Sequence, residues 1–373
     1  MEKVRLGIIG FGNIGSLHTK LILDGETPDI VLSAVADISP EKREAAKGLL
    51  GTDFLIYNDG SELIAKCNIA KGNIDAVLVA VPHYGHASLS IEAFNAGLHV
   101  LCEKPAGVYT KQVREMNEAA LKSGKIFAMM FNQRTNSCYK KMRELVTSGS
   151  FGAIIRASWI ITDWFRTDAY YTSGEWRGSW DGEGGGVLLN QSPHQLDMFQ
   201  WICGMPNKVR AFCHNGKWHN IEVEDDVTAY FEYPNGATGT FITSTGEAPG
   251  TNRFEISMEM GKIVNDGGNT LTVYRLSENM REFCKTSPDP YKAPDCTIEK
   301  PEIEKDNPQH AGVMRSFAGN ILRGEPLVAE GKEGINGLIL SNAMHLSSWL
   351  DKTIDIPFDE DLFLEELNKR RKK

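Results

Sequence analysis

The sequence predicts an α/β protein of two domains. Residues 1–130 are expected to form a doubly wound parallel sheet of the Rossmann type, and residues 131–373 an α+β domain with a large, mostly antiparallel open sheet. A buried-type strand leads into a glycine-rich turn near residue 10, strands and helices alternate to residue 130, and consecutive strands follow from residue 150. Whether the last helices of the chain pack back on the first domain stays open.

The turn after the first strand has the spacing of a dinucleotide-binding loop. Val4–Ile9 is a short apolar run typical of a strand buried on both faces, and the residues after it fit G-x-G-x-x-G. The first glycine permits the tight turn, the second lets the backbone approach a pyrophosphate, and the third lets helix and strand pack closely. The free N–H groups of the following helix would face the phosphates. The residues assigned to the cofactor here are Gly10, Phe11, Gly12, Asn13, Ile14 and Gly15.

A second buried-type strand, Ile30–Ala36, ends at Asp37. An acidic residue at this distance from the glycines can accept hydrogen bonds from the adenosine ribose, and it would repel the 2′-phosphate of NADP. NAD is therefore the predicted cofactor and NADP the less favoured one, with Lys42 and Arg43 as nearby cations that could offset the preference. The alternatives are a Rossmann-like core without a ligand and a methyltransferase that binds its nucleoside cofactor at the same turn.

The remaining elements of the first domain follow from apolar runs and capping residues. Ser39 is the predicted cap of a helix over Pro40–Leu50. Further strands are expected at 54–57, 74–81, 98–102 and 126–131, and further helices at 59–66, 84–96 and 110–123. Strands that alternate with helices in this way predict parallel pairing through crossover helices.

In the second domain, strands are expected at 154–165, 209–214, 227–233, 237–245, 253–260 and 262–264. Pro234-Asn235-Gly236 is a strong hairpin turn signal between two of them. Helices are expected at 188–202, 310–322 and 332–350, and the proline-rich stretch 287–307 is predicted to be a loop. Consecutive strands favour an open antiparallel sheet. Such a sheet often packs one face against a second subunit, so a homo-oligomer, a dimer or tetramer, is expected.

The composition is that of an ordinary globular protein, with 373 residues of which 41% are hydrophobic and 24% charged. The net charge of −9 disfavours nucleic acid and anionic membrane surfaces as partners, and it mostly aids solubility. The first strand begins at residue 4 and no apolar run has the length of a membrane span, so a cytoplasmic location is expected. The seven cysteines form no C-x-x-C pair and fit reduced thiols, and no histidine pair has the further ligands of a metal site. The basic run 369–373 is expected to be a solvated helix end.

Candidate catalytic groups are sought where strands end, because ligands of doubly wound sheets bind beyond the carboxyl ends of the strands. Lys104 follows a buried strand directly and would be held next to the cofactor there. Pro105 fixes the backbone after it, and their peptide bond is a candidate for the cis form. The alternative is that Lys104 only pairs with Glu103 or caps a helix. The other cofactor residues assigned at strand ends are Val81, Pro82, His83 and Glu103.

A second constellation lies in the other domain. Three glycines at 184–186 permit close approach of the backbone to a ligand. Asn190, His194 and Asp197 then fall at i, i+4 and i+7, on one face of a helix with Pro193 in its first turn. A histidine there can take a proton near neutral pH. A satisfied structural histidine is the alternative, and the neighbouring amide, carboxylate and glycines favour the catalytic interpretation.

The stretch 163–177 is dense in aromatic residues and arginines. Aromatic faces stack on the C–H surfaces of sugars, and arginines bind hydroxyls or carboxylates, so this stretch suits a carbohydrate. A domain-interface core is the alternative, and one loop can do both. The residues assigned to substrate binding are Trp164, Arg166, Trp176 and Arg177, together with Lys104, Asn190 and His194.

Together, these motifs resemble the glucose-fructose oxidoreductase / inositol dehydrogenase / MocA (Gfo/Idh/MocA) family over nearly the whole chain. The matching segments are 10–15, 79–86, 100–105, 131–134 and 184–197. The resemblance implies a nicotinamide cofactor that exchanges hydride with a secondary alcohol of a sugar, cyclitol or sugar derivative. It also implies cofactor contacts from His86 and Asn132.

The resemblance further implies catalytic roles. Lys104 matches the family's catalytic lysine, which stabilises the reacting oxygen, and His194 matches its usual acid/base. Inositol dehydrogenase-like members have Asp four residues before that histidine, where this chain has the uncharged Asn190, so Asp197 or Lys104 could carry more of the work. Two other functions stay open: a redox-neutral sugar-modifying enzyme that keeps its NAD bound while it cleaves or epimerises a glycoside, and a non-enzymatic NAD-binding regulator.

Overall fold

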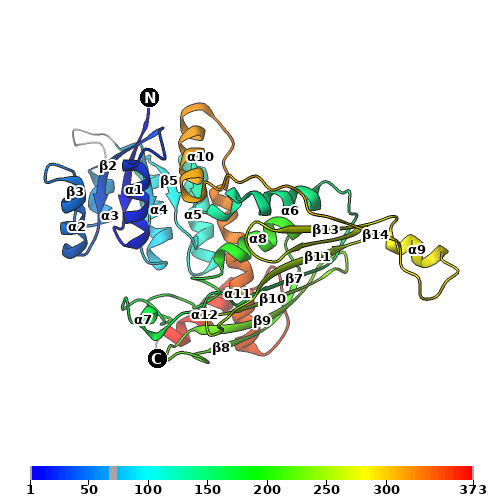
Figure 1. Ribbon diagram of the computed structural model, residues 1–373. Coiled ribbons are helices and arrows are strands. Elements are labelled where there is room, and N and C mark those ends of the chain that lie inside the picture. Colours follow the sequence, from blue (N-terminus) through cyan, green and yellow to red (C-terminus); the bar gives the residue numbers. More distant parts are fainter. Residues whose placement is uncertain (1, 67–73, 372–373) are drawn as a thin grey trace. The chain divides into compact units, whose positions relative to one another are not determined.

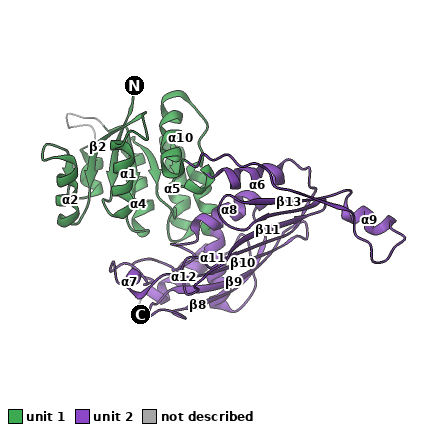
Figure 2. Cartoon of the chain, in the orientation of Figure 1, with its two compact units in different colours: residues 1–135, 308–338 green, residues 136–307, 339–373 purple. Residues whose placement is uncertain are grey.

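The computed structural model describes residues 2–66 and 74–371 and divides the chain into two compact units (Figure 2). Unit 1 comprises residues 1–135 and 308–338, and unit 2 comprises residues 136–307 and 339–373. Cys67, one of the seven cysteines, and Lys372 and Lys373 of the basic run lie outside the described residues. In the described part of the chain, every helix is too short or too polar to span a bilayer.

The sheet of unit 1 has six parallel strands among the described residues, in the order β3-β2-β1-β4-β5-β6 (Figure 1). The strands are β1 (Val4–Ile9), β2 (Ile30–Ala36), β3 (Ile56–Tyr57), β4 (Ala76–Val79), β5 (His99–Cys102) and β6 (Phe127–Met129). The strand order reverses between β1 and β4, and doubly wound sheets bind their ligands beyond the carboxyl ends of the strands at such a point. The predicted parallel sheet is confirmed.

In the part of unit 1 that the structure describes, five helices cross over between these strands as predicted: α1 (Asn13–Leu23), α2 (Pro40–Leu50), α3 (Gly60–Ala65), α4 (Tyr84–Asn95) and α5 (Thr110–Ser123). Unit 1 also contains α10 (Gln309–Arg323), which was expected in the second domain, and the short 3₁₀ turns η1 (Asn132–Thr135) and η2 (Gly331–Glu333). Ser39 caps α2 as predicted, because its hydroxyl accepts from the N–H of Lys42. Helix α10 comes from far along the chain and packs into the same core as β1 through Met314 and Phe317. Each such fully buried apolar side chain contributes about 1.5–3 kcal/mol.

Unit 2 is built on a sheet of nine strands among the described residues, in the order β14-β13-β12-β11-β7-β10-β9-β8-β15. The strands are β7 (Ile154–Ile161), β8 (Lys208–Asn215), β9 (Glu224–Glu232), β10 (Thr238–Ser244), β11 (Asn252–Met258), β12 (Gly261–Asn265), β13 (Leu271–Leu276), β14 (Cys296–Glu299) and β15 (Ile354–Asp355). Strands β7 and β10 run parallel, and the other neighbours run antiparallel. The prediction of a mostly antiparallel sheet is confirmed.

Aromatic side chains fill the space between this sheet and its helices. The helices of unit 2 are α6 (Ser137–Thr147), α7 (Asp168–Tyr171), α8 (Pro193–Cys203), α9 (Met280–Thr286) and α12 (Glu360–Arg371), and α11 (Gly334–Leu350) begins in unit 1 and continues here. Phe199 of α8 packs against Phe231, Phe241 and Phe254 with ring centroids 5.5–6.0 Å apart. Trp159 of β7 is fully buried and stacks on Phe254 at 4.2 Å. These rings hold α8, and with it the segment that leads into the helix, on the sheet.

Two predictions about unit 2 are wrong. Helix α8 begins at Pro193 rather than at residue 188, since proline favours the first helical position, and residues 188–192 form turns instead. Asn190 therefore precedes the helix and does not share a helical face with His194. The stretch 287–307 is not all loop, because it contains β14, which pairs with β13 at the edge of the sheet. Helix α9 precedes this stretch and lies at the far end of the two strands (Figure 1).

Candidate functional site

The glycines of the first loop have two different structural roles. Gly10 has φ +99°, and a Cβ there would lie 2.3 Å from the carbonyl oxygen of Ala80. A Cβ on Gly15 would lie 1.9 Å from the carbonyl oxygen of Gly10. The chain's own packing therefore requires both glycines. A Cβ on Gly12 would have no atom within 4 Å, so only a ligand would need that position to be glycine.

The start of α1 suits an anion. Gly12 is the N-cap of this helix, and since it has no side chain, the first N–H groups of α1 receive no side-chain cap. They point out of the positive end of the helix dipole. The open space over Gly12 and the uncapped N–H groups together fit a pyrophosphate, with the backbone of residues 11–14 as its partner.

Asp37 ties this loop to the end of β2. Its Oδ2 accepts from the N–H of Phe11 at 2.7 Å, and its Oδ1 accepts from the N–H of Ser39 at 2.8 Å. The guanidinium of Arg43 stays beside it, because Nη1 donates to the carbonyl oxygens of Asp37 and Ile38 at 2.8 and 3.0 Å. Beside the glycine-rich loop there is thus a partly exposed carboxylate, with a cation whose position is fixed by backbone carbonyls.

The loops after β4 and β5 are joined by His86. This imidazole is buried, with Nδ1 2.6 Å from the carbonyl oxygen of Pro105 and Nε2 2.7 Å from that of Val81. Burial lowers the pKa of His86, against the effect of the two carbonyls. The structure thus places His86 behind the two loops, as a link between them. His83, also assigned to the cofactor, is buried at the start of α4, and the Lys104–Pro105 bond is cis.

Lys104 follows a buried carboxylate at the end of β5. Glu103 Oε1 lies 2.7 Å from Nε2 of His18, and His310 of α10 packs edge-on against His18 at 5.4 Å between ring centroids. Burial alone would raise the pKa of Glu103, but the hydrogen bond and charge of His18, with Lys104 and His310, bring that pKa down to about 2. Glu103 Oε2 also accepts from the N–H of Lys104 at 3.1 Å. The ionised carboxylate therefore fixes the backbone from which the Lys104 side chain extends.

Asn132 carries a polar atom that the protein does not satisfy. Its Nδ2 donates to Oε1 of Gln309 at 2.6 Å. Its Oδ1 is buried and has no hydrogen-bond partner among the described residues. Leaving such an acceptor unpaired costs about 1–3 kcal/mol, which a ligand with an N–H or O–H group would recover. Asn132 follows β6, at the same edge of the sheet as Gly12 and Lys104, and this fits the cofactor role predicted for it.

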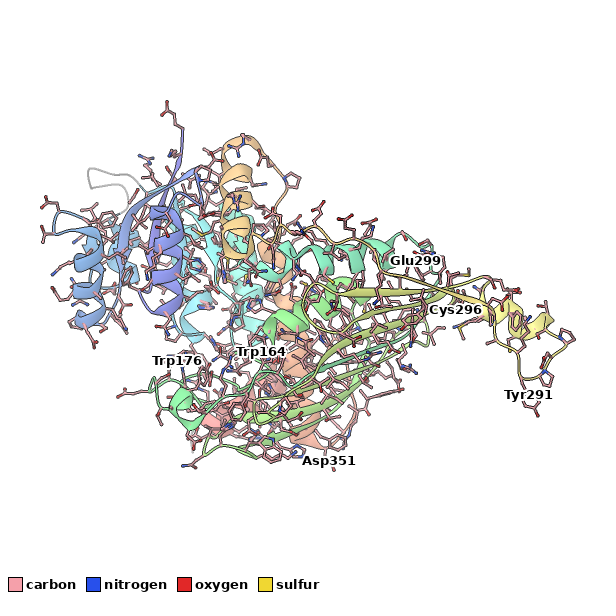
Figure 3. All side chains as sticks on the ribbon, in the orientation of Figure 1. Trp164, Trp176, Tyr291, Cys296, Glu299 and Asp351 are labelled. Atoms are coloured by element: carbon pink, nitrogen blue, oxygen red, sulfur yellow. The ribbon has the colours of Figure 1, made fainter. Side chains whose placement is uncertain are left out.

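In unit 2, arginines and aromatic rings alternate around α7. Arg166 lies over the rings of Trp164 and Tyr170, at 5.4 and 5.0 Å from their centroids. Arg177 lies over Tyr170 and Trp176, at 4.3 and 4.4 Å. All four residues that the sequence assigned to substrate binding on this stretch are therefore brought together around one tyrosine (Figure 3 labels Trp164 and Trp176).

Tyr170 links this group of residues to the segment before α8. Its Oη accepts from Arg177 Nη1 at 2.5 Å, from Gln191 Nε2 at 3.0 Å and from Asn190 Nδ2 at 3.1 Å. Asn190 and the aromatic stretch thus form one hydrogen-bonded network. His194 follows as the second residue of α8 and is half-buried. Asp197, by contrast, is fully buried and accepts from Gln200 Nε2 at 3.0 Å, which places it in the interior of unit 2.

The last of the three glycines before this segment packs against the chain itself. A Cβ on Gly186 would lie 1.9 Å from the carbonyl oxygen of Glu224, so the close approach there is to the backbone of β9 and not, as expected from the sequence, to a ligand. The buried carboxylate of Glu224 accepts from the N–H of Gly186 at 2.9 Å and from that of Leu188 at 3.0 Å. His345 Nε2 lies 3.0 Å from it. Burial opposes ionisation of Glu224, but His345 and these N–H groups lower its pKa.

Sequence reasoning missed two carboxylates of this region. Glu224 was hidden in an acidic run, and Glu183 stands directly before the three glycines. A carboxylate flanked by residues with no polar side chains is the signal that could have found Glu183. No group of three or more His, Cys, Asp or Glu side chains in the described ranges is arranged to hold a metal ion.

Comparison with known proteins gives matches over both units. A family model described as "Oxidoreductase family, NAD-binding Rossmann fold" matches residues 4–131, and one described as "GFO/IDH/MocA C-terminal domain" matches residues 139–264. Myo-inositol 2-dehydrogenase of Thermotoga maritima is 26% identical over 348 residues, which are 91% of this chain and 95% of that protein. Inositol 2-dehydrogenase of Rubrobacter xylanophilus is 28% identical over 352 residues, 92% and 90% of the two chains. The solved structure of the WlbA dehydrogenase from Chromobacterium violaceum, in complex with NADH and UDP-GlcNAcA, is similar with a TM-score of 0.81 and 26% identity, over 96% of this chain and 97% of that one.

Proposed function

The chain belongs to the Gfo/Idh/MocA family of oxidoreductases, with an NAD-binding Rossmann domain, and on that premise we propose that it oxidises a secondary alcohol of a sugar, cyclitol or sugar derivative. Two of the relatives named above are inositol dehydrogenases, and the third is a dehydrogenase whose structure was solved in complex with NADH and UDP-GlcNAcA, which supports this class of substrate. The reaction needs a group that takes the hydroxyl proton, a group that stabilises the charge on the oxygen, and a cofactor that takes the hydride.

The residues of unit 1 fit NAD. The backbone of residues 11–14 would hold the pyrophosphate, Asp37 the adenosine ribose, and Asn132 Oδ1 would accept a donor from the cofactor or substrate. When bound, NAD supplies the acceptor for the hydride that leaves the carbinol carbon. The carboxylate of Asp37 favours NAD over NADP, whose extra phosphate it would repel.

His194 and Lys104 are the proposed catalytic residues. His194 removes the proton of the substrate hydroxyl as the carbon–hydrogen bond breaks, and Lys104 donates a hydrogen bond to the same oxygen. A cation at that oxygen lowers the barrier because negative charge develops there in the transition state. The buried carboxylate of Glu103 next to Lys104 fixes the backbone of this lysine, so little reorganisation is needed when the substrate arrives.

Asn190 and the residues around α7 are proposed to hold the substrate. Trp164 and Trp176 offer faces for the C–H surface of a ring, and Arg166 and Arg177 offer N–H groups for its oxygens. Each arginine is already stacked between two aromatic side chains, so its orientation is set before binding.

The observation that carries the proposal is the place of Lys104, two residues beyond β5 at the edge where the parallel strands end. The test is a panel of cyclitols, glycosides and sugar nucleotides incubated with NAD, with the absorbance of NADH as the readout. Lys104→Ala and His194→Ala should each lower kcat at least about a hundredfold. Lys122→Ala and His214→Ala are the controls, since both side chains are largely exposed, and they should leave kcat unchanged. Full activity of Lys104→Ala would refute the mechanism.

We also propose a homo-oligomer that works in the cytoplasm. Phe212 of β8 and Tyr230 of β9 are about half exposed on the open sheet, which supports a covered face in an assembled state. Light scattering of the purified chain should give a dimer or tetramer, and a monomer at micromolar concentration would contradict this.

A further inference from the structure

Glu183 is a carboxylate enclosed by the segment that leads into α8. Only 1% of the residue is exposed. Its Oε2 accepts from the N–H of Gly178 at 2.7 Å, and its Oε1 accepts from Nδ2 of Asn190. A buried carboxylate is costly to keep, so these two hydrogen bonds hold it in one position.

The hydrogen bonds of Asn190 fix which way its amide faces. The same Nδ2 donates to Glu183 and to Tyr170 Oη at 3.1 Å, so both amide hydrogens point to this side. The reverse orientation would set the amide oxygen against the carboxylate oxygen of Glu183. The carbonyl oxygen of Asn190, an acceptor, therefore lies on the side away from Glu183.

We propose that Glu183 is a positioning residue for the reaction: its carboxylate orients the Asn190 amide and adds a negative charge behind it, beside the segment that leads into His194. Asn190 alone can orient a hydroxyl or an imidazole but carries no charge. Glu183 and Asn190 together supply both an oriented acceptor and a charge that stabilises a protonated imidazole. This inference rests on the proposed function, in which His194 takes the substrate proton.

The surroundings of Glu183 make its charge sensitive to pH. Burial raises the pKa of Glu183 to about 7, and the N–H of Gly178, the Asn190 amide and the charge of Arg177 limit the rise. The negative charge of Glu224 of β9 raises the pKa of Glu183 further, and His345 of α11 lies beside Glu224. Tyr170 binds the same Asn190 amide, and the pKa of Tyr171 is raised by burial and also by the charge of Glu183. Asp181 precedes Glu183 by two residues, and Glu222 accepts from the N–H of Trp180. As pH falls through 7, Glu183 takes a proton, and its hold on Asn190 weakens.

The first test needs no substrate. The titration of His194 is followed by nitrogen NMR of histidine-labelled holoenzyme, with the signal assigned by its loss in His194→Gln. Glu183→Gln should lower the pH midpoint of His194 by a few tenths of a pH unit, because it removes the fraction of negative charge that Glu183 keeps while the imidazole titrates. Glu222→Gln removes the same charge from an exposed residue that accepts from the N–H of Trp180, and it should leave the midpoint in place. An unchanged midpoint in Glu183→Gln would overturn the proposal.

The second test uses a substrate found in the panel. Glu183→Gln can accept from Gly178 or from Asn190 but not from both, so kcat at pH 8 should fall about tenfold and its decline below pH 7 should become shallower. The double variant Glu183→Gln/Asn190→Asp returns a carboxylate to the network and should regain most of the loss, which a purely structural role would not allow. A double variant no better than the single one would contradict the proposal. If the wild type oxidises nothing in the panel, the proposed function fails, and the His194 titration still decides the role of Glu183.

Discussion

Gly12→Ala should separate cofactor binding from folding. The new Cβ would meet no protein atom within 4 Å, and the backbone at Gly12 has φ −73°, which alanine adopts without strain. The fold should therefore lose at most about 1 kcal/mol, the usual difference between N-cap residues. The same Cβ would occupy the space over the start of α1 that a pyrophosphate needs. Loss of one hydrogen bond to a charged group costs about 1.5–3 kcal/mol, so the Kd for NADH should rise about ten- to hundredfold.

Gly15→Ala should mainly lower the stability of the fold. Its Cβ would lie 1.9 Å from the carbonyl oxygen of Gly10, so α1 and the loop would have to move apart by about 1 Å. Overpacking of this kind costs about 1–3 kcal/mol or more. Since about 1 kcal/mol lowers Tm by roughly 2–4 °C in a protein part of this size, Tm should fall by about 2–12 °C.

The two variants are compared by thermal melting and by the quenching of tryptophan fluorescence on titration with NADH. Gly48→Ala is the matched control, because Gly48 lies within α2 and its Cβ would also meet nothing within 4 Å. Alanine there should raise stability slightly and leave NADH binding unchanged. If Gly12→Ala binds NADH as tightly as the wild type, or loses as much stability as Gly15→Ala, then the space over Gly12 is not the pyrophosphate site.

Three further predictions concern single side chains. The folded-state pKa of Glu103 is lowered to about 2, so this carboxylate stabilises the fold above pH 4.5, and the stabilisation is lost as pH falls toward 2. Glu103→Gln should remove this pH dependence of the free energy of unfolding, which is on the order of 3 kcal/mol and is measured by urea unfolding at several pH values. Trp159→Ala deletes a fully buried ring stacked on Phe254 and should cost about 3–5 kcal/mol, seen as a lower Tm, and a cost under 1 kcal/mol would contradict the packing described. Asp37→Ala frees the N–H groups of Phe11 and Ser39 and should weaken NADH binding about tenfold while NADPH binding changes less, and equal losses for the two nucleotides would refute the role given to this charge.

Most of the fold of unit 1 could be predicted because its strands are largely apolar and several of its helices have a capping residue or a glycine stop, whereas nothing local in the sequence shows that α10 joins this unit. Pro40–Leu50 and Thr110–Ser123 form helices with the predicted bounds. In unit 2, α9 and β14 could not be predicted, since all four residues of β14 are exposed and no residue of α9 is buried. Without a buried face there is no periodicity to detect.

The positions of some candidate site residues could be predicted from the order of strands and helices. Lys104 and Asp37 stand at strand ends, and the positions of parallel strand ends follow from the topology. The start of α8 was misjudged because the apolar residues 187–189 look helical, although Pro193 sets the true first turn. Glu183 escaped notice because its importance comes from contacts with Gly178 and Asn190, and side-chain hydrogen bonds of this kind cannot be derived from spacing.

The most direct test of the central claim is the titration of the freshly purified chain with NADH and with NADPH, after mass spectrometry has measured any nucleotide that it already carries. We expect NAD or NADH among the retained nucleotides, or an empty protein that binds NADH at least about tenfold more tightly than NADPH. A protein that retains no dinucleotide and binds neither nucleotide would rule out the dinucleotide site at the start of α1.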